Sequence, residues 1–158
     1  LGAIGLLDEA TKIQCLSYKR FYKQTKTHTR CIVKEFFEYT VKHGHTTIWH
    51  SAFCYHLPLL VNLRVIKDFT PTPVTLMHGV VNNVQLIDSL ALSREFHPDK
   101  LNGHGLEAWA KQLGTYKPEI SDWENLPIEE YVSRCENDVI TTEALFKYLA
   151  EKLEITYE

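Results

Sequence analysis

The sequence lacks any apolar run near the roughly 20 residues that a membrane-spanning helix requires. It also lacks a CxxC pair and an HExxH motif, which argues against a zinc ribbon, a redox dithiol and a zinc-protease site. We therefore expect no membrane role and a cytoplasmic protein with reduced, mostly buried thiols. The cysteines in question are Cys15, Cys31, Cys54 and Cys135.

The composition of the 158 residues, 44% hydrophobic and 23% charged, is that of an ordinary globular protein. This length predicts one domain over residues 1–158 with a single core. Three of the eight histidines gather in "KHGHTTIWH" as His43, His45 and His50. Their spacing matches no common metal-ligand pattern, so we interpret them as solvated or core side chains.

Charge is divided unevenly along the chain. Residues 12–42 contain eight basic and two acidic residues, whereas residues 117–158 contain eleven acidic and four basic ones. The basic segment is suited either to contacting phosphate or to forming a solvated strand pair, and the sequence leaves both interpretations open.

Periodicity predicts an α/β pattern, with strands first, then alternating helices and strands, then helices. Leu106, Trp109, Ala110 and Leu113 form an amphipathic helical stripe that Gly114 ends. Pro127 opens a long C-terminal helix that reaches about residue 153. The remaining expectations are a strand within 13–21, a strand followed by a short helix within 27–44 that Gly44 ends, a strand over 45–53, a helix over 55–66, a loop or short strand excursion over 67–84, a strand or short helix over 85–96, and a loop over 98–105.

Five segments resemble, in order and spacing, the 3′–5′ exonuclease (proofreading) domain of phage-type family A DNA polymerases, which belongs to the DEDD exonucleases. They are "GLLDEATKIQCLSYK", "IWHSAFCYHLPLL", "LIDSLALSREFHPDK", "GHGLEAWAKQLG" and "DWENLPIEEYVSRCENDV". The resemblance covers nearly the whole chain except an insertion at about 64–84. It implies a ribonuclease H-like exonuclease fold, with a mixed central sheet flanked by helices.

The resemblance also implies where a reaction would take place, because this family holds two Mg²⁺ ions with four carboxylates. At the first motif Gly2 stands where the family has Glu, and the partner Asp would precede Leu1. At the second motif Ser51 stands for Asn and Tyr55-His56 for an aromatic-Asp pair. A neutral imidazole is a poor magnesium ligand, and a protonated one would repel the ion.

The third motif keeps its aspartate as Asp138, but Arg134 and Ser133 stand where the family has a Tyr or His that positions the attacking water. Neither can take a proton from water near neutral pH. The family uses five functional groups, namely four carboxylates and the residue that positions the water. Asp138 is the one of these five that this sequence shows, and a lone aspartate favours a helix-surface role. We interpret Tyr131 as a core residue and Asp88 as a structural turn residue.

These replacements favour a catalytically inactive exonuclease-like protein, a pseudo-enzyme with no catalytic residue, metal or cofactor. We expect a phage-encoded chain that acts in the host cytoplasm by binding a protein partner, such as a host or replication factor. The insertion could supply the contact surface, or it could be a plain surface loop.

Two alternatives stay open. In the first, the chain binds single-stranded nucleic acid in the old substrate groove, where Arg134 and His56 would add positive charge. Trp49 and Tyr55 would offer stacking faces there, although both positions also suit core packing. In the second, less favoured, the chain is an active exonuclease that uses Mn²⁺ or Zn²⁺ through His56, Asp138 and an upstream residue.

Overall fold

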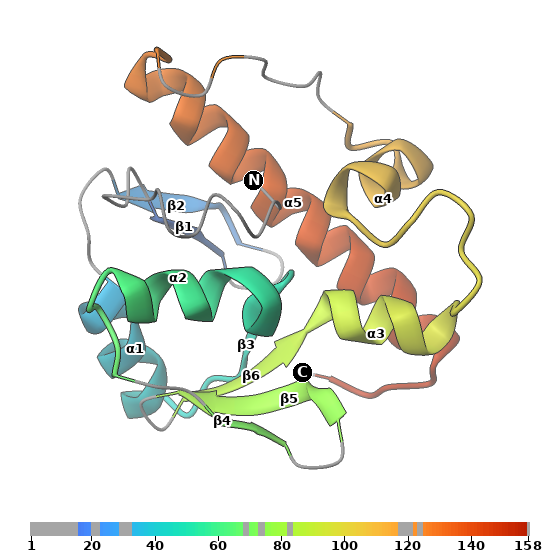
Figure 1. Ribbon diagram of the computed structural model, residues 1–158, viewed down its shortest axis with the longest axis horizontal. Coiled ribbons are helices and arrows are strands. Elements are labelled where there is room, and N and C mark those ends of the chain that lie inside the picture. Colours follow the sequence, from blue (N-terminus) through green and yellow to red (C-terminus); the bar gives the residue numbers. More distant parts are fainter. Residues whose placement is uncertain are drawn as a thin grey trace. The chain divides into compact units, whose positions relative to one another are not determined.

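A computed structural model describes residues 16–19, 23–28, 33–67, 70–72, 75–81, 84–116, 122 and 125–157. These residues form two compact units (Figure 1). The first unit consists of the described part of Val33–Asp99, and the second of the described parts of Ile13–Ile32 and Lys100–Glu158. Both helices and strands are present, so the expected α/β class is confirmed. The prediction of a single domain stays a prediction.

The first unit is built on a four-stranded sheet with the order β3-β6-β5-β4. Strand β3 (Thr47–Trp49) pairs in parallel with β6 (Val84–Asp88), whereas β5 (Thr75–Val81) pairs antiparallel with β6 and with β4 (Thr70–Thr72). The sheet is therefore mixed. The insertion at about residues 64–84 contributes β4 and β5. Of the two predicted alternatives, a loop or a short strand excursion, the strand excursion is therefore correct.

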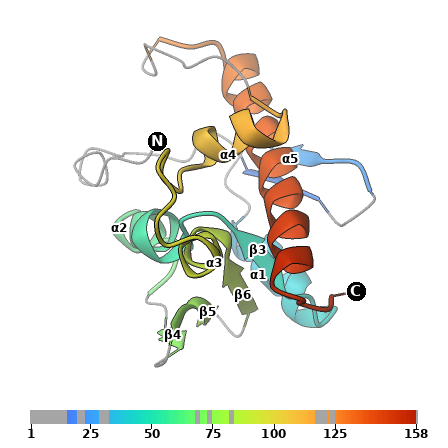
Figure 2. The same ribbon diagram turned by 90° about the vertical axis from the view of Figure 1, so that its right-hand side faces the viewer.

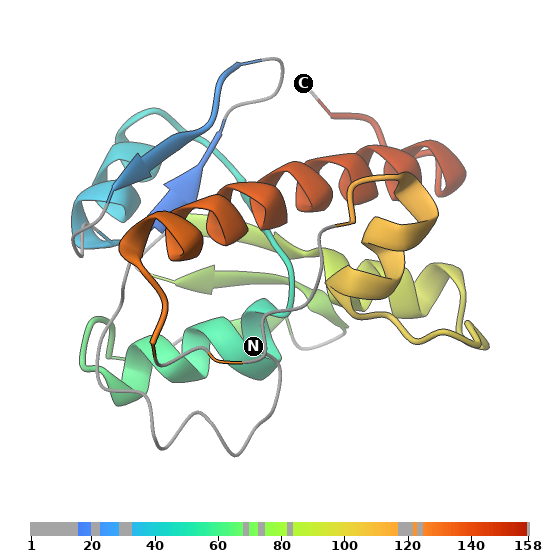
Figure 3. The same cartoon turned by 90° about the horizontal axis from the view of Figure 1, so that it is seen from above.

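Helices lie on both sides of this sheet. Figures 2 and 3 show α1 (Val33–Lys42) on one side and α2 (Leu57–Asn62) on the other. Gly44 follows α1 with a positive φ of 66°, which ends the helix as predicted. The buried apolar residues are Phe37, Ala52, Phe53, Tyr55, Leu57, Leu60, Ile66, Leu86, Leu90 and Leu92.

The segment after β3 differs from the prediction of a strand over 45–53. The strand ends at Trp49, the chain turns at Ser51, and a π-helix η2 (Ala52–His56) runs directly into α2. Alternation of apolar and polar residues could not reveal this turn, because the turn depends on hydrogen bonds that backbone N–H groups donate to a distant carboxylate, that of Asp88. Segment 85–96 contains both predicted alternatives, since β6 is followed at once by α3 (Ser89–Phe96).

The second unit combines a β-hairpin with two helices. Strands β1 (Leu16–Tyr18) and β2 (Lys26–His28) pair antiparallel and lie along α5 (Ile128–Lys152), as Figure 3 shows. Helix α4 (Leu106–Leu113) lies beside α5 (Figure 1) and ends at Gly114 with a φ of 77°. The predictions of α4 and of a long helix after Pro127 are confirmed.

Apolar and polar contacts join α4 to α5. Trp109 is fully buried, and its ring centroid lies 5.5 Å from that of Tyr148. Just after α4, the Thr115 hydroxyl lies 2.8 Å from that of Thr141, and the Asn137 amide donates to the Thr115 carbonyl. Both polar contacts satisfy buried groups on α5, because Asn137 and Thr141 are buried.

Two further expectations concern thiols and membranes. Cys54 and Cys135 are free thiols, but Cys54 is exposed, so the expectation of burial is wrong at this position. It fails because Cys54 lies on the outer side of η2, between the buried Phe53 and Tyr55. Within the described residues, none of the helices is both long enough and apolar enough to span a bilayer.

Candidate functional site

The candidate site in the first unit lies where β3 and β6 end. The two strands are parallel, and Trp49 is paired with Asp88, so both chains leave the sheet at the same edge. In open α/β sheets this carboxyl edge is where ligands bind. Here it gathers Ser51, His56 and Asp88, two of which are positions of the second motif.

Asp88 organises this edge through backbone hydrogen bonds. Its Oδ1 accepts from the N–H of Ser51 at 2.9 Å and of Leu90 at 3.0 Å, and its Oδ2 accepts from the N–H of Phe53 at 3.2 Å. One carboxylate therefore holds the start of η2 and also caps α3. Its interpretation as a structural turn residue is confirmed.

The environment of Asp88 is dry, since the residue is 2% exposed. Burial raises the pKa of the Asp88 carboxyl, and the backbone N–H donors of Phe53, Leu90, Ser51 and Ala52 oppose that rise without cancelling it. The donors are neutral dipoles at helix starts, which favour a carboxylate without supplying a full positive charge.

Ser51 adopts a left-handed conformation, with φ 62° and ψ 40°. Such angles are uncommon outside glycine, and Asn tolerates them better than Ser. The exonuclease family to which the resemblance points has Asn at this position. The turn is therefore made in this chain by a residue that suits it less well than Asn would.

His50 and Ser89 form a hydrogen bond that superficially looks like a catalytic pair. His50 Nδ1 lies 2.9 Å from Ser89 Oγ, and the Ser89 hydroxyl donates to the Trp49 carbonyl at 3.0 Å. Because Ser89 has one hydroxyl proton, Nδ1 of His50 must be the donor in their contact. A fully buried serine whose proton is engaged elsewhere is a structural group, not an activated nucleophile.

His56 is the last residue of η2, and two aromatic rings flank it. Its ring centroid lies 5.9 Å from that of Trp49 and 5.3 Å from that of Tyr55, both in edge arrangements. Burial lowers the pKa of His56 to about 4, and a hydrogen bond with the His50 backbone opposes this only in part. The imidazole is therefore neutral at pH 7, and the expectation that it adds positive charge is wrong.

The two aromatic candidates for base stacking are packed into the same cluster. Tyr55 is 6% exposed, as expected for a core residue, and burial raises the pKa of its hydroxyl. Trp49 is half-buried, stacks near Phe37 at 6.1 Å, and donates its indole N–H to the Thr47 hydroxyl. Tyr55, which is buried, therefore presents little ring surface to a nucleotide.

The third-motif positions belong to the second unit, on α5. Ser133 and Arg134 are half-buried and Asp138 is exposed, as expected for a helix-surface aspartate. Arg134 and Asp138 are four residues apart and so share one helix face. Tyr131 is half-buried, so its assignment to the core is confirmed only in part. Gly2, from the first motif, lies outside the described residues.

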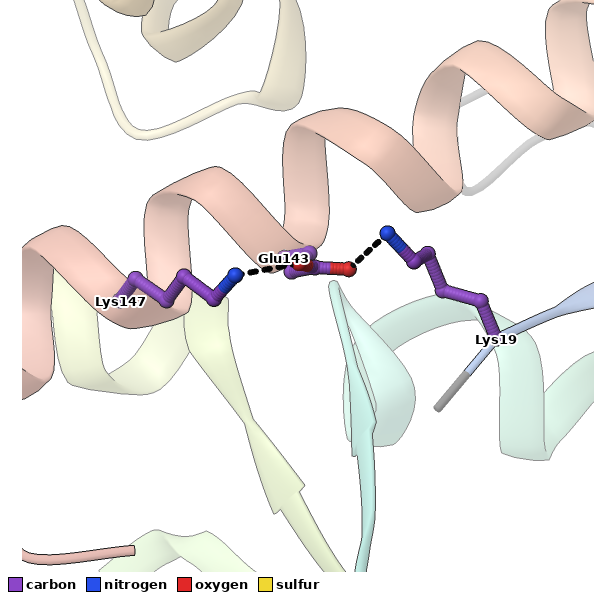
Figure 4. Close-up of polar contacts among 3 residues, drawn as sticks. All are labelled: Lys19, Glu143 and Lys147. Atoms are coloured by element: carbon purple, nitrogen blue, oxygen red, sulfur yellow. Dashed lines mark hydrogen bonds and ion pairs between the residues drawn. The ribbon is translucent and has the colours of Figure 1, made fainter. Parts of the chain in front are cut away.

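The same helix carries an ion-pair network that the sequence reading missed. Glu143 Oε2 lies 2.5 Å from Lys19 Nζ, and Glu143 Oε1 lies 2.5 Å from Lys147 Nζ, as Figure 4 shows. Burial is the largest single influence on the pKa of Glu143 and would raise it, but the two lysines together outweigh burial and lower the pKa. The Glu143–Lys147 spacing of four residues was a usable signal, whereas Lys19 was not identifiable from sequence.

Within the part of the chain that the structure describes, no three His, Cys, Asp or Glu side chains are arranged to hold a metal ion. Models of known protein families give no match to the chain, and a search of curated proteins gives no significant match. The relationship to exonucleases therefore remains a resemblance carried by the sequence motifs.

Proposed function

We propose that this chain is a catalytically inactive exonuclease-like protein with a ribonuclease H-like fold, encoded by a phage, that acts by binding a protein partner such as a host or replication factor. The five sequence segments that resemble the exonuclease domain support the fold assignment. The mixed sheet, with its parallel β3–β6 pair between helices, is compatible with it.

One observation carries the proposal of inactivity. At the carboxyl edge of β3 and β6, the buried carboxylate of Asp88 is occupied by three backbone N–H groups, and the neighbouring motif positions hold Ser51 and a neutral His56. A pair of magnesium ions requires several anionic oxygens directed at one point. Ser51 and His56 supply none, while Asp88 maintains the backbone turn.

The β4–β5 hairpin is the surface that we propose for the protein partner. Among the described residues β4 is the edge strand of its sheet, and edge strands present backbone N–H and C=O groups to a neighbouring chain. Pro71 removes one N–H from β4, which shortens the stretch available for pairing. We therefore expect a contact made by the hairpin as a whole rather than by one long added strand.

A nuclease assay tests the loss of catalysis. Labelled single-stranded DNA is incubated with the purified chain in Mg²⁺, Mn²⁺ or Zn²⁺, and no shortening is expected in any of them. If the chain were instead an active exonuclease of the family that it resembles, it would shorten the DNA. The Asp138→Ala variant would then lose that activity. That result would overturn the proposal.

A binding experiment tests the partner. Proteins retained from host and infected-cell lysates are purified and titrated against the chain by calorimetry, with a stoichiometric complex at low micromolar affinity or better as the expected result. The Thr70→Lys/Thr72→Lys variant, which charges β4, should weaken that complex at least tenfold. The Asn102→Lys/Gln112→Lys variant adds the same charge at exposed positions of the second unit and should not. Equal weakening by both variants, or no complex with any purified candidate, would refute the proposed surface.

A further inference from the structure

The β1–β2 hairpin has two chemically different faces. Ser17 and Thr27 are paired across the strands, their hydroxyls lie 2.8 Å apart, and Thr27 donates to Glu136 on α5 at 2.7 Å. This face therefore packs against the helix. Tyr18 pairs with Lys26, and side chains alternate along a strand, so Tyr18, Lys26 and His28 lie on the opposite, outer face.

Two aromatic side chains lie together on the outer face. The rings of Tyr18 and His28 are stacked, with centroids 5.9 Å apart and planes inclined by only 8°. Both residues are half-buried, so part of each side chain is open to solvent. Aromatic rings on a sheet face are a recurring platform for unstacked nucleotide bases, because every base offers a π-face of similar size.

The charge around these rings is positive. The sequence from 16 to 28 contains no Asp or Glu, and its described lysines are Lys19, Lys23 and Lys26. Lys19 is engaged by Glu143 on the helix side, whereas Lys23 and Lys26 are exposed. Lysines that border a stacking surface suit the alternating bases and phosphates of a nucleic-acid strand.

We propose that the outer face of the β1–β2 hairpin, formed by Tyr18, Lys26 and His28 with Lys23 at its end, binds single-stranded nucleic acid. Bases stack on Tyr18 and His28 while Lys23 and Lys26 contact phosphates. Duplex DNA is disfavoured because its base faces are already stacked on one another. This binding goes beyond the proposed protein partner and uses neither the β4–β5 hairpin nor the old substrate groove.

Fluorescence anisotropy with a labelled oligothymidylate of about 20 nucleotides tests the proposal, at 50 and 150 mM salt. The wild-type chain should bind more tightly at the lower salt and should prefer the single strand over a duplex of the same length. Tyr18→Leu should weaken binding about fivefold or more, since stacking on one ring is lost. Tyr18→Phe, which keeps the ring, should bind like the wild type.

A matched pair of lysine variants separates a specific contact from net charge. Lys26→Gln should lower the slope of log affinity against log salt by about 0.7, the value for one phosphate contact on a single strand. Lys152→Gln makes the same charge change at an exposed position on α5, sixteen residues beyond Glu136 and hence about 24 Å along the helix. It should leave the slope unchanged. Circular dichroism and the thermal midpoint verify that each variant is folded.

Several results would overturn the proposal. The first is an absence of salt-sensitive binding at micromolar protein. Equal effects of Lys26→Gln and Lys152→Gln would indicate attraction by net charge only. Binding that survives Tyr18→Leu but is lost in Arg134→Gln would locate the strand in the old groove. Competition by polyglutamate as effective as that by unlabelled oligothymidylate would indicate a surface for acidic proteins. None of these results bears on the complex formed through the β4–β5 hairpin.

Discussion

Two carboxylates with little exposed surface, one in each unit, are stabilised by opposite kinds of partner. Asp88 accepts hydrogen bonds from neutral backbone N–H groups, and burial raises its pKa. Glu143 lies between two lysine ammonium groups, and they lower its pKa against the effect of burial. The comparison shows that the first unit uses its buried carboxylate to fix a backbone turn, whereas the second uses one to join a hairpin to a helix.

The difference bears on the proposed function because Asp88 lies at the carboxyl edge of β3 and β6, beside the second-motif position Ser51. A carboxylate directed at metal ions should have oxygens aimed at open space, with its backbone support coming from elsewhere. In this chain the Asp88 oxygens are directed at N–H groups of η2 and α3. Among the described residues at this strand edge, the Asp88 carboxylate is therefore engaged by the backbone and is not directed at a metal site.

The largest effect is expected for Asp88→Ala. The change leaves the N–H groups of Ser51, Phe53 and Leu90 without their acceptor and removes the cap of α3, which should lower the free energy of unfolding by about 3 kcal/mol or more. Urea denaturation measures the loss. Asp138→Ala, at the exposed third-motif position, should cost less than about 0.5 kcal/mol. Comparable losses in the two variants would contradict the structural role of Asp88.

A smaller loss is expected for Glu143→Gln. Lys19 and Lys147 would then face each other without a shared anion, which should lower the free energy of unfolding by about 1–2 kcal/mol. The control is Glu107→Gln, because Glu107 and Lys111 have the same four-residue spacing and a 2.6 Å contact but are solvent-exposed. That exposed pair should contribute less than about 0.5 kcal/mol. If Glu143→Gln lowers the free energy of unfolding no more than Glu107→Gln does, the Glu143 ion pairs do not stabilise the second unit more than an exposed ion pair does.

The two carboxylates should respond to pH in opposite directions. The lowered pKa of Glu143 means that its contribution is present above the unfolded Glu pKa of about 4.3 and is lost as pH falls through the folded pKa. The raised pKa of Asp88 means that its contribution is complete below the unfolded Asp pKa of about 3.9 and is lost as pH rises through the folded pKa.

Unfolding free energies measured from pH 3 to pH 7 test these signs. Relative to the wild type, Glu143→Gln should reduce the loss of stability on acidification, and Asp88→Asn should reduce the loss on raising the pH. If both variants change the slope in the same direction, the contrast between neutral and cationic partners is wrong.

The smallest effect is expected at the turn that Asp88 fixes. Ser51→Asn places a residue that tolerates a φ of 62° at that position and should raise the free energy of unfolding by about 0.5 kcal/mol. Ser133→Asn provides the control, because Ser133 lies within helix α5, where the same substitution relieves no strain. Thermal midpoints at equal concentration resolve the two variants, and a destabilised Ser51→Asn chain would indicate that the Ser51 hydroxyl itself is needed.

Local patterns predicted several features of this protein correctly. The stripe that includes Trp109 gave α4 with its end at Gly114, and Pro127 gave the start of α5. These features depend on side chains within one or two helical turns, so periodicity and capping preferences contain them. The residues at the motif positions, including Ser51 and His56, are likewise identified from the sequence alone.

The remaining features depend on contacts between residues far apart in the chain. Ser51 turns because Asp88, 37 residues later, accepts its N–H, and Lys19 meets Glu143 only because the hairpin lies along α5. The neutrality of His56 arises from burial, and the two faces of the β1–β2 hairpin differ because one packs on a helix. The sequence by itself determined which chemical groups are present and the bounds of α4 and α5. Tertiary structure alone decided the partners and charge of those groups, because burial and long-range hydrogen bonding exist only once the chain is packed.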